Sequence, residues 1–393
     1  MTMSYDFNNW VPRLHTQSSK WSHLQEDNPI APQTRIALGV AEMDFPCATE
    51  ILSAVAARAQ RGILGYTVSQ DAQYLAAICQ WQQRRYGVDT KPEHIVYCRG
   101  ANLALTSAVE ALTKPGEGVI IQPPTFQHFQ RTVAQQGRVV VENTMLQAAD
   151  GSYALDFSDL EQKAADPNNT LLILCSPNNP TGNLWSEKDL LRLGNICLSN
   201  GVRILSDDVH QEIVRQNFEF VSLAKLFPQS EDIIVITSLS KGFNIAGLQL
   251  CHVLMPRESD RSAFLAVIKR QGPSPLEIAA TIAAYTEADQ WLHEVNAYID
   301  GNMAYLGAYL AKELPDFACA LPEATYMCWV PIAPSGMDAD TFQKRLAEEA
   351  LLGLNTGAIY GGNGSEYVRF NVATPRFVLQ EALERFARFV RAQ

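Results

Sequence analysis

Short apolar runs recur through the middle of this 393-residue chain, and segments with helical periodicity separate them. A strand that is apolar on both faces must be covered on both faces, so this alternation predicts a mostly parallel sheet between layers of helices. We expect strands at residues 95–98, 118–121, 138–141, 171–175, 202–206 and 232–236. We expect helices at residues 102–112, 126–136 and 186–200. The predicted fold class is therefore α/β.

The pattern changes on both sides of this alternating region. Residues 1–48 are rich in proline and polar side chains and are predicted to be irregular, whereas residues 49–62 and 71–86 are predicted helices. After residue 273 we expect long helices up to residue 314, strands at 326–332 and 367–371, and helices at 340–350 and 376–391. We therefore predict a large domain of residues 49–288 and a smaller α+β domain formed by residues 1–48 and 289–393.

Charge and composition exclude several classes of protein. The net charge of −11 argues against binding to nucleic acid, because the chain has no excess of basic residues to neutralise phosphates. No apolar run reaches the roughly 20 residues that cross a membrane, and the first ten residues do not form a signal-peptide core. Eight cysteines without a C-x-x-C motif indicate free thiols rather than a disulfide framework. We expect a cytoplasmic protein that binds neither nucleic acid nor membrane.

A lysine follows the predicted strand 232–236, where a ligand would bind. The residues after this strand are Thr237-Ser238-Leu239-Ser240-Lys241, and open α/β sheets bind ligands at the carboxyl ends of their strands. A partly desolvated lysine has a lowered pKa and can act as an amine nucleophile or a proton carrier. A single loop lysine is more often an ordinary surface residue than a reactive one. Whether Lys241 is reactive therefore depends on the polar residues that follow the neighbouring strands.

Other polar clusters follow neighbouring predicted strands. Asp207 and His210 come directly after strand 202–206, and the Ser-Pro-Asn-Asn-Pro-Thr-Gly loop at residues 176–182 follows strand 171–175. The Gly-Ala-Asn turn at residues 100–102 joins a strand to a helix start, where free N–H groups and the helix dipole attract anions. Arg369 lies inside the apolar strand 367–371; such an arginine pairs with an internal carboxylate or binds a substrate carboxylate through two hydrogen bonds.

Two other interpretations of these clusters are weaker. Asp207, Asp208 and His210 could bind a metal ion, but no second cluster of ligands completes a shell, so we predict no metal site. Ser238 and Lys241 form an S-x-x-K motif of the kind found in serine hydrolases, but the companion motifs S-D-N and K-T-G are absent.

A pyridoxal 5′-phosphate (PLP) enzyme needs a lysine, an acid against the ring nitrogen and a site for phosphate. From about residue 35 to 391, the chain resembles fold-type I PLP enzymes of the aspartate aminotransferase superfamily, which implies a large, mostly parallel seven-stranded sheet. The cystathionine β-lyase or C–S lyase branch is the most similar, through Ala41-Glu42-Met43-Asp44-Phe45 and residues 240–249. His210 and Gln249 stand where typical aminotransferases carry a tyrosine and a phosphate-binding arginine, and both departures match this branch.

The resemblance implies a role for each site residue. Lys241 bonds to the cofactor aldehyde and later removes the Cα proton, and Asp207 keeps the ring nitrogen protonated. Asn179 hydrogen-bonds the ring 3′-oxygen, with His210 nearby. Arg369 binds the substrate α-carboxylate. Phe126 is implied to stack on the ring face, where this branch commonly carries a tyrosine. The residues implied to bind the phosphate are Ala101, Asn102, Ser238 and Ser240. The chain is implied to form a homodimer, in which Tyr66 of the second subunit also reaches this phosphate.

The implied reaction is cleavage of the Cβ–S bond of an amino acid such as cystathionine, which releases a thiol, pyruvate and ammonia. An aminotransferase using the same residues is the first alternative, because both reactions start by removing the Cα proton. An alternative of another class is a regulatory protein that binds a transcription activator, since some lyases of this branch do so.

Overall fold

The computed structural model describes residues 4–13, 16–21, 35–269 and 271–393. Its largest element is a seven-stranded sheet with the strand order β2-β10-β9-β8-β7-β3-β4. The strands are β2 (Ile95–Arg99), β10 (Leu250–Leu254), β9 (Ile233–Thr237), β8 (Arg203–Asp207), β7 (Asn169–Cys175), β3 (Gly118–Ile121) and β4 (Val139–Glu142). Strand β10 runs antiparallel to both of its neighbours, β2 and β9, and the other pairs of adjacent strands are parallel. The predicted α/β class with a mostly parallel seven-stranded sheet is confirmed.

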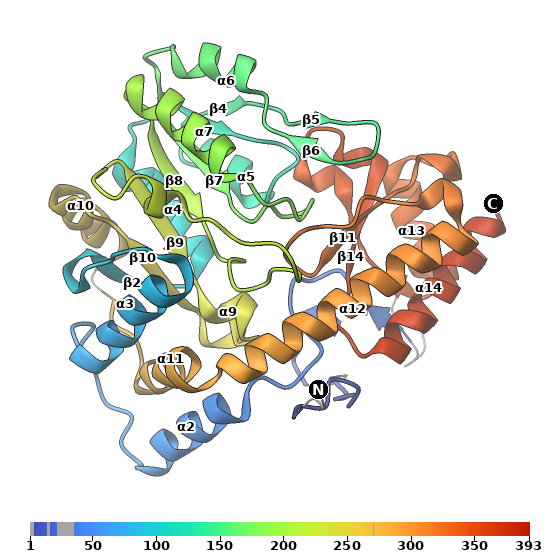
Figure 1. Cartoon of the computed structure of the whole chain (residues 1–393), viewed down its shortest axis with the longest axis horizontal. Coiled ribbons are helices and arrows are strands. Elements are labelled where there is room, and N and C mark those ends of the chain that lie inside the picture. The colour runs from blue at the N-terminus through green and yellow to red at the C-terminus, as the bar shows by residue number, and fades with distance from the viewer. Residues whose placement is uncertain (1–3, 14–15, 22–34, 270) are drawn as a thin grey trace.

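Alternate residues of the strands belong to two different apolar clusters, one on each face of the sheet. Figure 1 shows the helices that cover the sheet. Tyr97 and Leu172 face one layer, whereas Cys98 and Leu171 face the other. The first layer contains α3 (Ala72–Tyr86), α6 (Phe157–Ala164), α7 (Glu187–Ser199) and α11 (Pro275–Glu287). The second layer contains α4 (Ala101–Leu112), α5 (His128–Gln135) and α10 (Glu258–Ile268). The continuous apolar runs of the central strands follow from this two-sided burial.

A second, antiparallel sheet with the order β11-β14-β13 lies in the C-terminal part of the chain. Its strands are β11 (Met327–Pro331), β14 (Tyr367–Asn371) and β13 (Asn355–Thr356), and α12 (Asp289–Glu313), α13 (Ala339–Glu349) and α14 (Arg376–Arg391) accompany them. In Figure 1, α12 runs from α11 to this part of the molecule. Near the N-terminus, β1 (Ile36–Ala37) pairs in parallel with β12 (Leu352–Gly353). The division into residues 49–288 and residues 1–48 with 289–393 stays a prediction.

Short elements complete the chain. They are α2 (Thr49–Gln60), α8 (Leu223–Leu226), α9 (Leu239–Gly242), the hairpin β5 (Leu146–Gln147) and β6 (Tyr153–Ala154), and the 3-10 turns η1 (Pro92–His94), η2 (Ala246–Leu248), η3 (Pro315–Phe317), η4 (Ala333–Ser335), η5 (Gly357–Tyr360) and η6 (Gly364–Glu366). The irregular segment predicted for residues 1–48 lies partly outside the described residues. In the described part of the chain, no helix combines the length and apolarity needed to cross a membrane.

The sequence analysis placed most elements within a few residues but assigned none to β10, α6 or α10. Strand β10 was not predicted because only the short α9 and η2 separate it from β9, so no long helical segment marks its start. A connection this short returns the chain antiparallel, whereas a parallel neighbour requires a long crossover. Leu250, the first residue of β10, therefore lies at the edge where the parallel strands end, opposite Arg99 of β2.

Candidate active site

A cavity of about 590 Å³ lies where β7, β8 and β9 end and α4 begins. This volume lies within the range of small-molecule sites. Its lining includes the predicted residues Ala101, Asn102, Phe126, Asn179, Asp207, His210, Ser238, Ser240, Lys241 and Arg369. Tyr66 does not line it; this residue is exposed on the segment that joins α2 to α3. The structure thus brings ten of the eleven predicted residues together from distant parts of the sequence.

Lys241 follows β9 within the short helix α9. Its Nζ donates a 2.8 Å hydrogen bond to the carbonyl oxygen of Ala41, far away in the sequence. Burial, followed by repulsion from Arg369, lowers the pKa of the Lys241 amine to about 8. About a tenth of the amine is therefore neutral at pH 7 and able to attack an aldehyde or accept a proton, far more than for an unperturbed lysine.

Asp207 is the last residue of β8 and is buried. Its Oδ1 accepts a 3.4 Å hydrogen bond from the Val209 N–H, and among the described residues no cation forms a salt bridge with it. Burial raises the pKa of Asp207 to about 7, although the Val209 N–H and the nearby Lys241 oppose this effect. A buried carboxylate of this kind is suited to a cationic ligand.

Arg369 and Asn179 are joined across the cavity. Arg369 Nη1 donates a 2.8 Å hydrogen bond to Asn179 Oδ1, and Nη2 donates a 2.6 Å bond to the carbonyl oxygen of Gly39. The guanidinium also lies over the ring of Tyr360, with 5.1 Å from Cζ to the ring centroid. No carboxylate in the described part of the chain forms a salt bridge with Arg369, and its buried Nε has no hydrogen-bond partner there. The structure therefore offers no support for an internal ion pair at this arginine.

His210 lies behind the same part of the cavity. It is buried, and its Nδ1 has no hydrogen-bond partner among the described residues. Burial, with Lys241 and Arg369 nearby, holds the pKa of His210 well below its usual value, so the ring is neutral. Among the residues that the structure describes, no group of three or more His, Cys, Asp or Glu side chains is arranged to hold a metal ion.

The opposite end of the cavity offers neutral hydrogen-bond donors. Helix α4 begins after Gly100, which has a φ of 88°, and no side chain of the described residues caps its first turn. The N–H groups of Ala101 and Asn102 are therefore available to an anion. Ser238 caps α9 instead, and its Oγ donates a 2.8 Å hydrogen bond to Ser240 Oγ.

Sequence reasoning gave no role in this cavity to Arg99, Asn355 or Tyr360, and it noted Gln249 only as the residue that stands where typical aminotransferases carry a phosphate-binding arginine. Arg99 and Gln249 lie beside the donors just described, and Arg99 Nε donates a 3.0 Å hydrogen bond to Gln249 Oε1. Asn355 and Tyr360 line the cavity near Arg369. Arg99 could have been found because it directly precedes the Gly-Ala-Asn turn, whereas Asn355 and Tyr360 lie in no recognisable motif.

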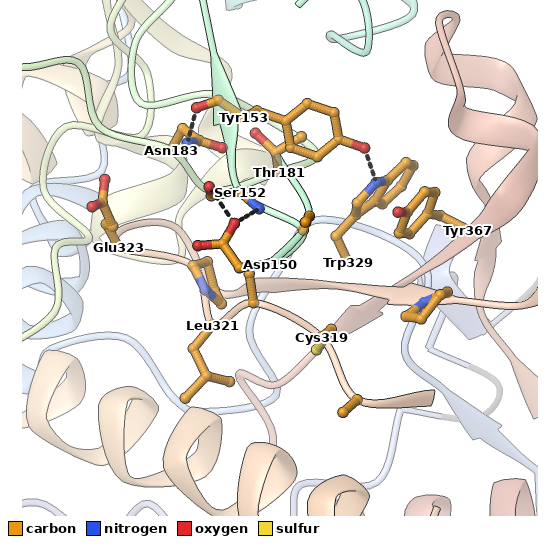
Figure 2. A pocket seen from close by; sticks show the side chains of 16 residues that line it. Asp150, Ser152, Tyr153, Thr181, Asn183, Cys319, Leu321, Glu323, Trp329 and Tyr367 are labelled. Carbon is orange, nitrogen blue, oxygen red and sulfur yellow. Dashed lines mark hydrogen bonds between the residues drawn. The ribbon is translucent and has the colours of Figure 1, made fainter. Parts of the chain in front are cut away.

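Figure 2 shows a second, smaller cavity of about 260 Å³, lined in part by residues of the Asn-Pro-Thr-Gly loop region. Thr181 of that loop lines it, together with Tyr153, whose hydroxyl accepts a 3.3 Å hydrogen bond from Trp329 Nε1. None of the ten residues gathered in the larger cavity lines this one. The two cavities are therefore chemically distinct.

The larger cavity fits PLP. The carboxylate of Asp207 lacks a cationic hydrogen-bond partner among the described residues, and the open first turn of α4 offers N–H groups to a phosphate. Lys241, with a pKa of about 8, suits the aldehyde. Asn179 and His210 would hold the ring oxygen side, and Phe126, which is half-buried, would cover a ring face. Each of these groups matches one part of the cofactor.

The lowered pKa of Lys241 predicts how the cofactor-free protein reacts with PLP. Because only the neutral amine attacks the aldehyde, the rate should rise with pH and level off above about 8. An unperturbed lysine would keep gaining rate past pH 10. Stopped-flow absorbance after mixing with PLP measures this rate, and Lys241→Ala is the control that should not react. A rate that still climbs between pH 9 and 10 would contradict the assigned pKa.

The buried charge of Asp207 predicts a gain in stability on its removal. Raising the pKa from 3.8 to about 7 costs roughly 4 kcal/mol of folding free energy above pH 7, and the cost shrinks as pH falls toward 4. Asp207→Asn should therefore raise the melting temperature of the cofactor-free protein more at pH 8 than at pH 5. It should also lower the gain in melting temperature that PLP provides.

Asp208→Asn is the matched control for this experiment. Asp208 is equally buried, but it accepts a hydrogen bond from the Ser206 hydroxyl and does not line the cavity. Its replacement should leave the gain from PLP unchanged. Equal PLP stabilisation of wild type and Asp207→Asn would exclude Asp207 from the cofactor site.

Comparison with known proteins agrees with this geometry. Residues 33–386 match the model of the family "Aminotransferase class I and II". The cystathionine β-lyase PatB of Bacillus subtilis is 37% identical over 97% of this chain and 98% of its own length. The protein MalY of Escherichia coli is 28% identical, with 99% of each chain covered.

A solved structure is similar over the whole fold. Cystalysin of Treponema denticola, which contains a PLP cofactor, superposes with a TM-score of 0.96 at 28% identity, covering 99% of this chain and 100% of its own. The resemblance noted in the sequence, the fold type and the PLP cofactor are thereby confirmed. On the family model and the 37% identical relative together, this chain belongs to the class I and II aminotransferase family of PLP-dependent enzymes.

Proposed function

We propose that the protein is a PLP-dependent C–S β-lyase that cleaves the Cβ–S bond of a sulfur-containing amino acid to give a thiol, pyruvate and ammonia. The observation that carries the proposal is the convergence of Lys241, Asp207 and Arg369 on one cavity. The similarity to the B. subtilis cystathionine β-lyase supports this reaction over others of the family.

Arg369 binds and orients the substrate. Its Nε has no partner among the described residues, and the guanidinium carries a positive charge that a substrate α-carboxylate would neutralise. The bonds to Asn179 and Gly39 fix its position before the substrate arrives. A substrate held in this way would have its Cα–H bond directed toward the Lys241 amine. Correct orientation of the reacting groups lowers the barrier to proton transfer.

Lys241 moves the Cα proton. When bound, PLP supplies an electron-withdrawing ring that makes this proton acidic. The pKa of about 8 lets the free Lys241 amine accept the proton and return it near neutral pH. Asp207 keeps a proton on the ring nitrogen, because the ion pair removes the cost of its own buried charge.

Phe126 does not prevent a thiolate from leaving. Phenylalanine has no hydroxyl with which to protonate the departing atom, whereas C–S lyases of this branch commonly carry a tyrosine at this position. A thiol has a pKa of about 8.5, so it leaves as an anion far more easily than an alcohol or an amine. Cleavage of a Cβ–S bond therefore does not require a hydroxyl at this position.

Two alternatives use the same structure differently. An aminotransferase would employ Lys241, Asp207 and Arg369 in the same way but would need a keto acid as second substrate, and the family that includes this chain is named for that reaction. A regulatory protein that binds a transcription activator would not depend on Lys241.

The test of the proposed function is the requirement for a keto acid. Purified, PLP-loaded protein incubated with cystathionine should release pyruvate without any added keto acid, and Lys241→Ala should release none. Lactate dehydrogenase coupling measures the pyruvate. Amino-group transfer that appears only when a keto acid is added would establish the aminotransferase instead. If the PLP-bound protein catalyses neither reaction, the regulatory alternative remains, and a pull-down from lysate tests it.

We further propose that the enzyme is a homodimer with shared active sites. The segment between α2 and α3 carries four large exposed side chains, which are Ile63, Leu64, Tyr66 and Val68. Figure 1 places α2 and this segment at the periphery of the molecule. An exposed apolar stretch of this kind marks a contact surface, and a second copy of the chain would cover it. Tyr66 would then reach the phosphate end of the partner's cavity.

The shared site predicts complementation between two defective variants. Tyr66→Phe should loosen PLP, and Lys241→Ala should abolish activity, so each parent dimer has a defect in both sites. In a mixed dimer, one site carries both defects and the other carries neither. Mixing should therefore restore PLP affinity and activity to part of the population, which a spectral titration and the pyruvate assay measure. No recovery after demonstrated subunit exchange would show that each chain completes its own site.

We also propose a cytoplasmic location. All eight cysteines are free thiols, and Cys98, Cys175, Cys197, Cys251 and Cys328 are buried. Free thiols persist in a reducing compartment, whereas oxidising compartments favour disulfides.

A further inference from the structure

We infer that Arg99 binds the phosphate group of the cofactor and that Gln249 positions the Arg99 guanidinium. This inference rests on the proposed function only in that the cavity holds PLP. It assigns the phosphate a cation that the motifs of the sequence did not reveal.

The pairing of β2 with β10 places the two residues together. Arg99, the last residue of β2, lies opposite Leu250, the first residue of β10, and Gln249 directly precedes Leu250. Arg99 Nε donates a 3.0 Å hydrogen bond to Gln249 Oε1. Both residues line the cavity beside Ala101 and Ser238. The guanidinium is therefore held at the end of the cavity where the open helix turn and the hydroxyls lie.

The charge balance of the cavity requires a cation at this end. A phosphate monoester carries a charge between about −1.5 and −2 near pH 7. Among the described residues that line the cavity, the cationic side chains are Arg99, Lys241 and Arg369. Lys241 bonds to the aldehyde, and Arg369 is tied to Asn179 and Gly39 at the substrate end. Arg99 is the cation that remains for the phosphate.

The hydrogen bond to Gln249 leaves Arg99 equipped for this role. It uses only the Nε–H group, so both terminal nitrogens of the guanidinium keep their N–H donors for an anion. No acidic residue in the described part of the chain forms a salt bridge with Arg99. The backbone of Gln249 is fixed at the end of η2, because its N–H donates to the carbonyl oxygen of Ala246. From this position its side-chain amide accepts the hydrogen bond that orients the exposed Arg99 guanidinium.

The test compares PLP with pyridoxal, which has the same aldehyde and ring but no phosphate. Spectral titration of the cofactor-free protein gives both dissociation constants. Arg99→Gln should weaken PLP about ten- to a hundred-fold, in keeping with the loss of a charged hydrogen-bonding group, and change pyridoxal less than about twofold. Arg131→Gln, which removes an arginine of α5 that does not line the cavity, should change neither constant.

Gln249→Ala separates positioning from direct binding. If Gln249 acts through Arg99, its replacement should weaken PLP in the wild-type background and have no further effect in Arg99→Gln. A full effect of Gln249→Ala in the Arg99→Gln background would overturn the positioning role.

Two outcomes separate this inference from the proposed function. Equal weakening of PLP and pyridoxal by Arg99→Gln, or no weakening of either, would overturn the role of Arg99 while the wild type still binds both ligands. If the wild-type protein gives no spectral change with PLP or with pyridoxal, the cofactor site itself is wrong.

Discussion

The Asp207 carboxylate, buried at the end of β8 without a cationic hydrogen-bond partner among the described residues, is the constraint on which the site depends. Burying a charge in this way is costly, and a sheet edge built only for stability would avoid it. In the site proposed above, a cofactor with a protonated ring nitrogen would remove this cost. The same carboxylate would then both destabilise the cofactor-free protein and strengthen the binding of PLP.

Three cationic side chains line the cavity among the described residues, each in a different place. Arg369 is bonded to Asn179, Lys241 lies near Asp207, and Arg99 precedes the open turn of α4. Burial, and after it repulsion from Arg369, lowers the pKa of the Lys241 amine to about 8. Both effects favour the neutral amine, which is the form that attacks an aldehyde or accepts a proton. A substrate carboxylate on Arg369 would weaken the repulsion and raise the basicity of Lys241 when the proton has to be taken.

The segment before α2 completes the site from the N-terminal side. Gly39 and Ala41 offer their carbonyl oxygens to Arg369 and Lys241. Asn371 of β14 donates to the carbonyl oxygens of Val40 and Glu42, and buried Lys20 holds Asp44 with a 3.0 Å ion pair. These bonds fix the backbone of the segment, so its carbonyl groups orient the two reactive cations. The signature seen at residues 41–45 is therefore explained by the position of its backbone as much as by its side chains.

The sequence by itself determined the two-faced burial of the central strands and the polar clusters at their ends. These features are local, because apolar runs and the residues that follow them are read along the chain. The set of clusters also identified PLP, and with it ten residues that share one cavity. Tertiary structure decided what depends on pairing between distant segments. The antiparallel return of β10 brings Gln249 to Arg99, and the fold of η5 brings Tyr360 to Arg369. Neither contact produces a periodic pattern in the sequence. Arg99 and Gln249 are far apart along the chain, and Tyr360 lies in the irregular turn η5.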